Sequence, residues 1–180
     1  MQNDIARILL TEEELHARVK ALGEAITAEY KGKELLVVGI LKGSNVFMSD
    51  LIRQINMPLK IDFMIVSSYG NATESTGVVK IMKDIEQSIS DKHVLIVEDI
   101  IDSGLTLKYL TEMLHTRKPA SIKLCTLLDK PARRKENVDV DYVGFEMPDE
   151  FIVGYGIDYA EYYRNLPFVG ILKPEVYENK

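Results

Sequence analysis

Three carboxylates and two hydroxyl groups follow a short apolar run in the middle of the chain. The apolar run is residues 94–97, and the residues behind it that could do chemistry are Glu98, Asp99, Asp102, Ser103, Gly104 and Thr106. The hydroxyl groups, the glycine and the first N–H groups of a helix are suited to holding a phosphate, because they donate hydrogen bonds and the helix dipole favours an anion. Carboxylates would repel a phosphate, so Glu98 and Asp99 should face ribose hydroxyl groups or Mg²⁺. The stretch therefore predicts a site for a ribose 5′-phosphate.

The elements that must position these residues have the pattern of a parallel α/β fold. Apolar, β-branched runs at 35–40, 94–97 and 121–128 are typical of buried parallel strands. Apolar residues at helical spacing predict helices between them, and the first helix begins with a capping box of Thr11 and Glu14. Ligands of open α/β sheets bind beyond the carboxyl ends of the strands, where we expect Glu98 and Asp99 to stand. The sequence thus predicts a parallel sheet with helices on both faces.

The composition is that of a globular domain without a nucleic-acid-binding face. The chain has 180 residues, 46% of them hydrophobic, and a formal net charge of −6. This length suits one domain, and a nucleic-acid-binding face would need clustered Lys and Arg. No run approaches the roughly eighteen apolar residues of a membrane span, and the first residues lack the basic start and apolar run of a signal peptide. We therefore expect a cytoplasmic protein that contacts no membrane.

The single cysteine and the three histidines carry no prediction of chemistry. Cys125 is flanked by apolar residues and is expected in a core strand rather than as a nucleophile. His16, His93 and His115 lie far apart and lack Cys or His neighbours at zinc spacing, so we interpret them as ordinary surface or element-end residues.

Four separated segments resemble the phosphoribosyltransferases, and in particular those of purine salvage. The central one is VEDIIDSGLTL at 97–107, which is similar to the family's ribose-phosphate-binding signature. The others are LKG at 41–43, SSYGNATESTG at 67–77 and VGFEMPDEFIVGYGIDYAEYYRNLPFVGIL at 143–172. The resemblance implies the type I phosphoribosyltransferase fold in a single domain of residues 1–180. It comprises a parallel sheet flanked by helices and a small hood subdomain, built from the N-terminal segment and the chain after about residue 130. Residues 5–10 would form a short strand outside the main sheet.

The resemblance also implies an activity. Members of the family transfer the 5-phosphoribosyl group from 5-phosphoribosyl-1-diphosphate to a purine, with Mg²⁺ as cofactor. The acceptor implied here is a 6-oxopurine, hypoxanthine or guanine, and the products would be IMP or GMP and diphosphate. The residue carried over as general base is Asp102, and Lys130 would donate a hydrogen bond to the purine's oxygen.

The site residues that the resemblance implies fall into four groups. The ribose and 5′-phosphate would be held by Glu98, Asp99, Asp102, Ser103, Gly104, Leu105 and Thr106. The diphosphate would meet Leu41, Lys42, Gly43, Ser68, Tyr69 and Arg164, with Ser68 and Tyr69 in a loop that closes over it. The purine would meet Lys130, Phe151, Ile152 and Asp158, with Phe151 stacked on its ring. Magnesium would be held by Glu98, Asp99 and Asp158. In this family the peptide bond that matches Leu41–Lys42 can be cis.

Other interpretations stay open at this point. The central acids could cap an ordinary βα turn, LKG could be a turn capped by Ser44, and 68–77 could be a plain surface hairpin. Family members often carry Thr where this chain has Ser103, although serine keeps the hydroxyl donor. A regulatory protein that kept the fold and lost turnover is one rival. A nucleotide-binding phosphatase or kinase is another, but the kinase P-loop motif is absent from the sequence. Surfaces that bear Met and Tyr suggest a homodimer or homotetramer.

Overall fold

The computed structural model describes residues 1–68 and 79–178. Two 3-10 turns, Gln2–Asp4 and Pro131–Arg133, accompany the strands and helices. The strands are β1 (Ile5–Leu10), β2 (Leu35–Leu41), β3 (Lys60–Ser68), β4 (Val79–Lys83), β5 (His93–Ile101), β6 (Ser121–Asp129), β7 (Tyr142–Glu146), β8 (Ile152–Val153) and β9 (Val169–Leu172). The helices are α1 (Glu12–Tyr30), α2 (Asn45–Gln54), α3 (Leu105–His115) and α4 (Pro174–Tyr177). Tyr69 and the rest of the predicted closing loop lie outside the described residues.

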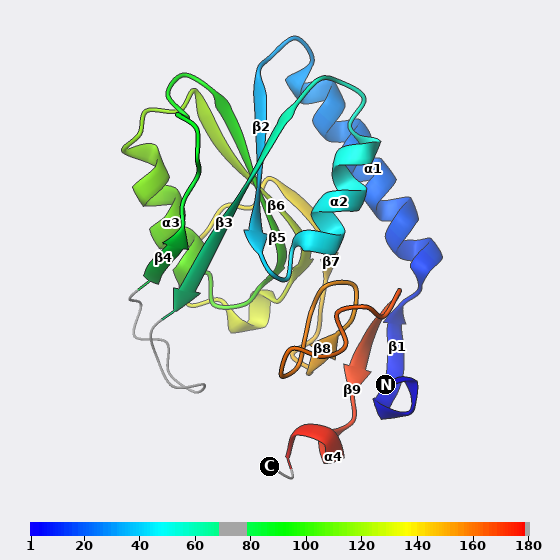
Figure 1. The fold of residues 1–180 in the computed structure, drawn as a ribbon. Helices are drawn as coiled ribbons and strands as arrows, with labels where there is room; N and C mark the ends of the chain where they lie inside the picture. The colour runs from blue at the N-terminus through cyan, green and yellow to red at the C-terminus, as the bar shows by residue number, and fades with distance from the viewer. Residues whose placement is uncertain (69–78, 179–180) are drawn as a thin grey trace.

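The larger sheet has six strands in the order β4-β3-β2-β5-β6-β7. Strands β3, β2, β5, β6 and β7 pair in parallel, and β4 is an antiparallel edge strand that pairs with β3. Figure 1 shows this sheet between α3 on one side and α1 and α2 on the other. The predicted parallel sheet with helices on both faces is confirmed.

Alternate residues of the central strands enter two separate cores. Leu95 and Val97 of β5 pack with the buried faces of α1 and α2, whereas Val94 and Ile96 pack with α3. A strand covered on both faces has no polar face, because successive side chains point to opposite sides of the sheet. This is why the strand appears in the sequence as a continuous apolar run.

Helix α1 begins and packs as its sequence predicts. Thr11 accepts a hydrogen bond from the backbone N–H of Glu14, and the Glu14 carboxylate accepts one from the Thr11 N–H, so the capping box is present. The apolar residues at helical spacing are buried: Leu15, Val19, Leu22 and Ile26. No helix in the described part of the chain is long and apolar enough to cross a membrane.

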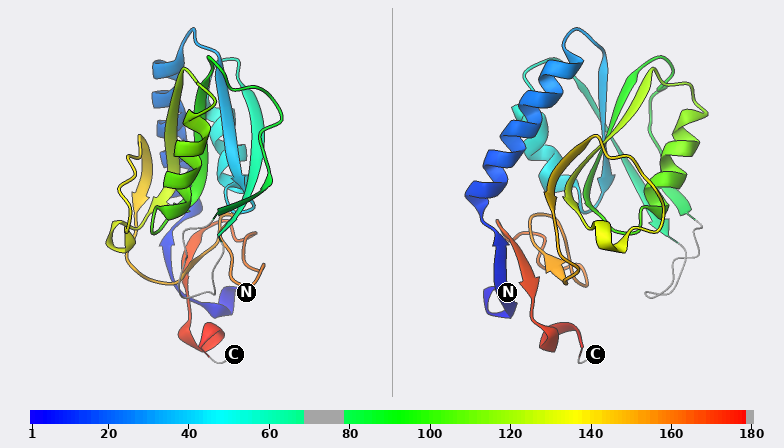
Figure 2. Two further views of the ribbon diagram at one scale, coloured as in Figure 1. Left: turned by 90° about the vertical axis from the view of Figure 1, so that its left-hand side faces the viewer. Right: turned by 180° about the vertical axis from the view of Figure 1, so that it is seen from behind.

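A smaller antiparallel sheet of β1, β9 and β8 forms the hood. Both views in Figure 2 show β1 and β9 side by side below the larger sheet, with both chain ends at this end of the molecule. The predicted strand at residues 5–10 outside the main sheet is confirmed. The predicted hood boundary near residue 130 is wrong, because β7 pairs with β6 in the larger sheet and the hood strands after it begin at β8.

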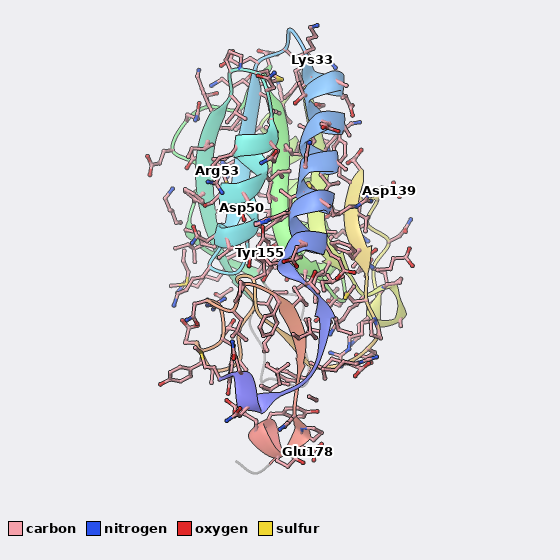
Figure 3. All side chains as sticks on the ribbon, turned by 90° about the vertical axis from the view of Figure 1, so that its right-hand side faces the viewer. Lys33, Asp50, Arg53, Asp139, Tyr155 and Glu178 are labelled. Carbon is pink, nitrogen blue, oxygen red and sulfur yellow. The ribbon has the colours of Figure 1, made fainter. Side chains whose placement is uncertain are left out.

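Polar contacts and a shared core join the hood to the rest of the molecule. The Tyr155 hydroxyl donates to the Asp50 carboxylate of α2 at 2.5 Å, and Figure 3 shows the two residues together at the hood end of that helix. Leu10, Ile152 and Val169 belong to the same buried cluster as α1 and α2. The hood is thereby held against the edge of the sheet where the acids lie.

Candidate active site

The strand that carries the acid pair is longer than the sequence predicts. We expected β5 to end before Glu98, but it continues to Ile101. Its pairing with β2 stops at Val97, whereas its pairing with β6 continues to Ile101 opposite Asp129. The expectation failed because the apolar run ends where β5 loses its pairing with β2, and the sequence does not show that pairing with β6 continues. Glu98 and Asp99 therefore lie where the sheet opens between β2 and β5.

The turn after β5 has the form of a phosphate-binding loop. Gly104 has a φ of 78° and precedes the first residue of α3, Leu105. A β-carbon at Gly104 would approach the Glu136 carbonyl oxygen to 2.9 Å, so both conformation and space favour glycine. The first N–H groups of a helix have no acceptor within it and point towards a bound anion. The Ser103 hydroxyl accepts a hydrogen bond from the Leu105 N–H at 3.4 Å.

A cavity of about 290 Å³ connects this loop with the acid pair. Its lining includes Leu41, Gly43, Glu98, Asp99, Asp102, Ser103, Gly104 and Thr106. All of these are residues predicted for the ribose phosphate or the diphosphate. The structure therefore brings two segments that lie more than fifty residues apart in sequence to one hollow.

The acid pair packs directly on the turn after β2. A β-carbon at Gly43 would lie 1.9 Å from Asp99 Oδ2, so the carboxylate fills the space that any other residue would need. Burial raises the pKa of Asp99 to about 6, against the lowering effect of backbone N–H groups and Arg164. Burial and the neighbouring Asp99 charge raise the pKa of Glu98 well above its usual range. Both shifts mean that the site favours a group that brings positive charge or hydrogen-bond donors to these carboxyls.

The turn between β2 and α2 differs from an ordinary capped turn. The Leu41–Lys42 peptide bond is cis, as the family resemblance implies it can be. Ser44 precedes α2 without capping it, and its hydroxyl donates instead to the Ile40 carbonyl oxygen at 2.6 Å. The Lys42 ammonium extends to Glu161 Oε2 at 2.5 Å. The alternative of a turn capped by Ser44 is therefore wrong.

Arg164 reaches the same region from the hood. Its guanidinium pairs with Asp158 Oδ1 at 2.8 Å and Glu161 Oε1 at 3.1 Å, and donates to the Gly156 carbonyl oxygen at 2.8 Å. Gly156 packs on the turn after β2, because a β-carbon there would lie 2.2 Å from the Gly43 carbonyl oxygen. The hood thus brings Arg164 close to Lys42, and both side chains contact the Glu161 carboxylate.

A second cavity of about 630 Å³ lies between the hood and the edge of the sheet. Its lining includes Lys130, Phe151, Ile152 and Asp158, the residues predicted to meet the purine. Phe151 is 37% exposed and its ring stacks on that of Tyr177, with centroids 4.6 Å apart and planes 18° apart. The structure therefore assembles all the predicted purine residues around one hollow of mixed aromatic and polar character.

Lys130 is held rigidly at the wall of this second cavity. Its side chain is 7% exposed, and its ammonium donates to the Glu150 carbonyl oxygen at 2.7 Å. Burial lowers the pKa of Lys130, and the carboxylate of Asp102 opposes this effect. A buried ammonium retains further N–H donors for a ligand in the cavity.

Asp102 lies at the junction of the two cavities. It lines both of them, and Ile100 is the other residue that they share. Asp102 Oδ1 is buried, lies 3.9 Å from Lys130 Nζ and accepts no hydrogen bond from the described residues. A buried acceptor without a donor costs free energy unless a ligand supplies the donor. Asp102 is therefore placed to receive a proton or an N–H group from a molecule that spans both cavities.

The donor set suits magnesium in part. Glu98 and Asp99 offer carboxylate oxygens beside the phosphate loop, and Mg²⁺ is commonly bound by one or two carboxylates together with substrate phosphates. Asp158 lines the other cavity, and its two oxygens already meet Arg164 and the Glu161 N–H. No group of three or more His, Cys, Asp or Glu side chains among the described residues is arranged to hold a metal. The chain alone provides carboxylates for magnesium rather than a complete cage.

The lining of the second cavity also includes residues that were not predicted from the sequence, among them Ile157 and Tyr177. Ile157 is 7% exposed and lines the cavity, and its position one residue before Asp158 was the available signal. Tyr177 lies in the last helix, beyond the segment that resembles the family, so nothing in the sequence marked it. Ser68 ends β3, and Tyr69 lies outside the described residues, so their predicted contact with diphosphate stays a prediction.

The remaining predictions about reactive side chains are confirmed. Cys125 lies in β6 and is 1% exposed. His16 and His115 are exposed, and His93 begins β5, where its Nδ1 meets the Ser121 hydroxyl at 2.8 Å.

Comparison with known proteins agrees with this geometry. The family model described as "Phosphoribosyl transferase domain" matches residues 8–160. The hypoxanthine-guanine phosphoribosyltransferase of Staphylococcus aureus (strain Mu50) is 58% identical over 179 residues, which cover 99% of this chain and 100% of that protein. A crystal structure of a hypoxanthine phosphoribosyltransferase from Staphylococcus aureus superposes with a TM-score of 0.96 at 58% identity and covers 98% of this chain and 96% of that one.

Some relatives are much longer. The bifunctional protein TilS/HprT of Listeria innocua is 57% identical over 177 residues, which cover 98% of this chain. The matched part spans 27% of that protein, so the chain corresponds to about a quarter of its length.

Proposed function

The chain belongs to the phosphoribosyltransferase family, and from this we propose that it transfers the 5-phosphoribosyl group of 5-phosphoribosyl-1-diphosphate to a 6-oxopurine. The acceptor would be hypoxanthine, guanine or both, and the products IMP or GMP and diphosphate. Relatives that match over their full length carry the name hypoxanthine-guanine phosphoribosyltransferase, which supports this choice of acceptor. The protein would thus act in purine salvage.

The observation that carries the proposal is the position of Asp102. Its Oδ1, which accepts no hydrogen bond from the described residues, lies between a cavity lined by the loop before α3 and a cavity lined by Lys130 and an aromatic ring. A nucleoside monophosphate would fit these two cavities, because its sugar phosphate and its base lie on opposite sides of the glycosidic bond between C1′ and N9. A P-loop kinase would also need the motif G-x-x-x-x-G-K-[ST], which is absent from the sequence.

The chain's own residues would perform the transfer by orientation and proton movement. The purine N9 forms a bond to C1′ of the ribose while the bond from C1′ to the diphosphate oxygen breaks, and the diphosphate leaves with that electron pair. Asp102 Oδ1 takes the proton from N7 of the purine, which keeps the base neutral as the new bond forms. The buried Lys130 ammonium donates to the exocyclic oxygen and stabilises the charge that develops there.

Each remaining group would hold one part of the substrates. Ser103, Gly104, Leu105 and Thr106 would bind the 5′-phosphate, and Glu98 and Asp99 would accept hydrogen bonds from the ribose hydroxyl groups. Phe151 would stack on the purine, with Ile152 and Asp158 at its edge. Lys42, Arg164 and the turn at Leu41 and Gly43 would meet the diphosphate, as Ser68 and Tyr69 also would.

Magnesium fits the carboxylate pair and is proposed as the cofactor. When bound, it would supply positive charge to the diphosphate leaving group. Glu98 and Asp99 would hold it, with Asp158 as the third carboxylate.

Initial rates with four bases test the proposal. The protein is incubated with magnesium, 5-phosphoribosyl-1-diphosphate and hypoxanthine, guanine, xanthine or adenine, and diphosphate release is measured. We expect turnover with hypoxanthine or guanine and none above background with adenine, because Lys130 offers a donor to an oxygen and not an acceptor for an amino group. Binding of nucleotide without turnover of any base would instead identify a regulatory protein that kept the fold.

Exposed apolar side chains bear on the assembly of the protein. The described chain exposes large apolar side chains on both sheets and α3, including Ile8, Ile61, Met82 and Tyr109, which supports a homodimer or homotetramer. Light scattering on the purified protein would measure the number of chains in the assembly.

We place the reaction in the cytoplasm, since its phosphoribosyl donor is a multiply charged molecule that does not cross membranes unaided.

A further inference from the structure

A hood carboxylate occupies the two cations that the proposed function assigns to diphosphate. Glu161 Oε2 lies 2.5 Å from the Lys42 ammonium, and Glu161 Oε1 lies 3.1 Å from the Arg164 guanidinium. One carboxylate therefore bridges a cation from the turn after β2 and a cation from the hood. No sequence signal marked Glu161, which is not among the residues that we predicted to bind substrate.

The backbone that presents Glu161 is a tight turn in an unusual conformation. Tyr159 and Tyr162 pair through two backbone hydrogen bonds of 3.2 and 3.0 Å, so Ala160 and Glu161 are the central residues of a two-residue hairpin. Both have positive φ, 51° for Ala160 and 70° for Glu161. Asn and Gly are the usual residues at such positions, because a side chain with a β-carbon is strained there. Strained, non-glycine backbone of this kind is commonly held in place at functional sites.

The turn is held by Asp158, which lines the second cavity, and by Arg164. Asp158 Oδ2 accepts a hydrogen bond from the Glu161 N–H at 2.9 Å, and Asp158 Oδ1 pairs with Arg164 at 2.8 Å. Arg164 also donates to the Gly156 carbonyl oxygen, while its Nε is buried without a partner among the described residues. Arg164 Nε is therefore a donor without a described acceptor, whereas Arg164 Nη2 already contacts the Glu161 carboxylate.

The ion pair of Glu161 with Lys42 is open to solvent, whereas the Arg164 side chain of the second pair is 24% exposed. The Glu161 side chain is 63% exposed and the Lys42 side chain 67% exposed. Exposed pairs of this kind contribute little to stability, so an incoming polyanion can displace the carboxylate at small cost. While it remains, the carboxylate neutralises the cations and repels a second anion.

We propose that Glu161 is an internal anion that fills the diphosphate subsite when diphosphate is absent and competes with diphosphate for Lys42 and Arg164. The inference rests on the proposed phosphoribosyl transfer. Its consequence is that Glu161 weakens the hold of the enzyme on product diphosphate and promotes its release, while it keeps the two cations together between turnovers.

The test compares Glu161→Gln with Glu24→Gln. Glutamine keeps the size of the side chain and removes its charge, and Glu24 is an exposed carboxylate on α1 whose replacement changes net charge equally. Sodium diphosphate is titrated into each protein by calorimetry with and without magnesium, and product inhibition by diphosphate is measured against 5-phosphoribosyl-1-diphosphate. Thermal melting shows whether both variants are folded.

We expect Glu161→Gln to bind diphosphate roughly three- to tenfold more tightly than the wild type, since the charged carboxylate no longer competes for Lys42 and Arg164. The gain should shrink at high salt, because these charges are screened. Glu24→Gln should match the wild type. Equal or weaker binding by Glu161→Gln, with the wild type still active and inhibited by diphosphate, overturns the inference and leaves the proposed function intact. A wild type that neither turns over hypoxanthine nor binds diphosphate overturns both.

Discussion

Replacing Asp102 by asparagine separates proton transfer from every other task of the site. Asparagine keeps the shape of the side chain but cannot accept the N7 proton of the purine. The loss of a positioned general base reduces rates by roughly a hundredfold to ten-thousandfold, which corresponds to about 3–5 kcal/mol at 1.36 kcal/mol for each factor of ten. We expect kcat with hypoxanthine to fall within that range.

The structure limits the other effects of this change. The Asp102 side chain is 46% exposed, its Oδ1 accepts no hydrogen bond from described residues, and its distance to the Lys130 ammonium is 3.9 Å. Removing such a charge should alter the free energy of unfolding by less than about 1 kcal/mol. The backbone of the phosphate loop is unchanged, so affinity for 5-phosphoribosyl-1-diphosphate should stay within about threefold of the wild type.

The assay combines kinetics with a matched control. Initial rates give kcat and the KM of each substrate, calorimetry gives the affinity for the phosphoribosyl donor, and thermal melting gives stability. Asp91→Asn is the control, because Asp91 is an exposed carboxylate just before β5 begins, at the opposite end of that strand. A kcat within threefold of the wild type would refute the general-base role, and so would a loss of turnover explained wholly by lost donor binding.

Three further changes test other parts of the site. Lys130→Met should raise the KM for hypoxanthine about tenfold or more and leave the KM for the phosphoribosyl donor unchanged. The variant lacks the ammonium that donates to the Glu150 carbonyl oxygen and that is proposed to donate to the purine oxygen. Equal changes in both KM values would contradict this role. Gly43→Ala should leave the protein folded but raise the KM for the phosphoribosyl donor about tenfold, since the new β-carbon would lie 1.9 Å from Asp99 Oδ2. An unchanged KM would show that the Asp99 carboxylate can move away without loss of function. Burial raises the pKa of Asp99 to about 6 in the folded state. The folded protein therefore binds more protons than the unfolded protein between pH 4 and 6. Because of this difference, Asp99 makes the metal-free protein less stable as pH rises through that window. Thermal melting of the wild type and Asp99→Asn, with and without magnesium, tests this. The variant should lose less stability between pH 4 and 6, and it should lack the rise in Tm that magnesium causes in the wild type at pH 7. The same change of Tm with pH and the same magnesium effect in both proteins would contradict the prediction.

Local patterns determined the elements of this fold. The capping box at Thr11 and the buried apolar run of β5 follow from short-range patterns, and both are present as predicted. The end of β5 was missed because the sequence does not record how long each neighbouring strand continues. The hood boundary was missed for a related reason: the short β7 joins the larger sheet only because β6 offers it a free edge.

The sequence also determined the phosphate loop and the acid pair, since a glycine with positive φ, hydroxyl groups and carboxylates stand there within a few residues of one another. Only the tertiary structure decided what surrounds them. It packs Gly43 against Asp99, lays Tyr177 on Phe151, and leaves Asp102 without a donor between two cavities. It also sets Glu161 between Lys42 and Arg164, residues more than a hundred positions apart in the chain. Contacts of this kind depend on which strand edges and turns meet after folding, and no periodicity or motif within a single segment encodes them.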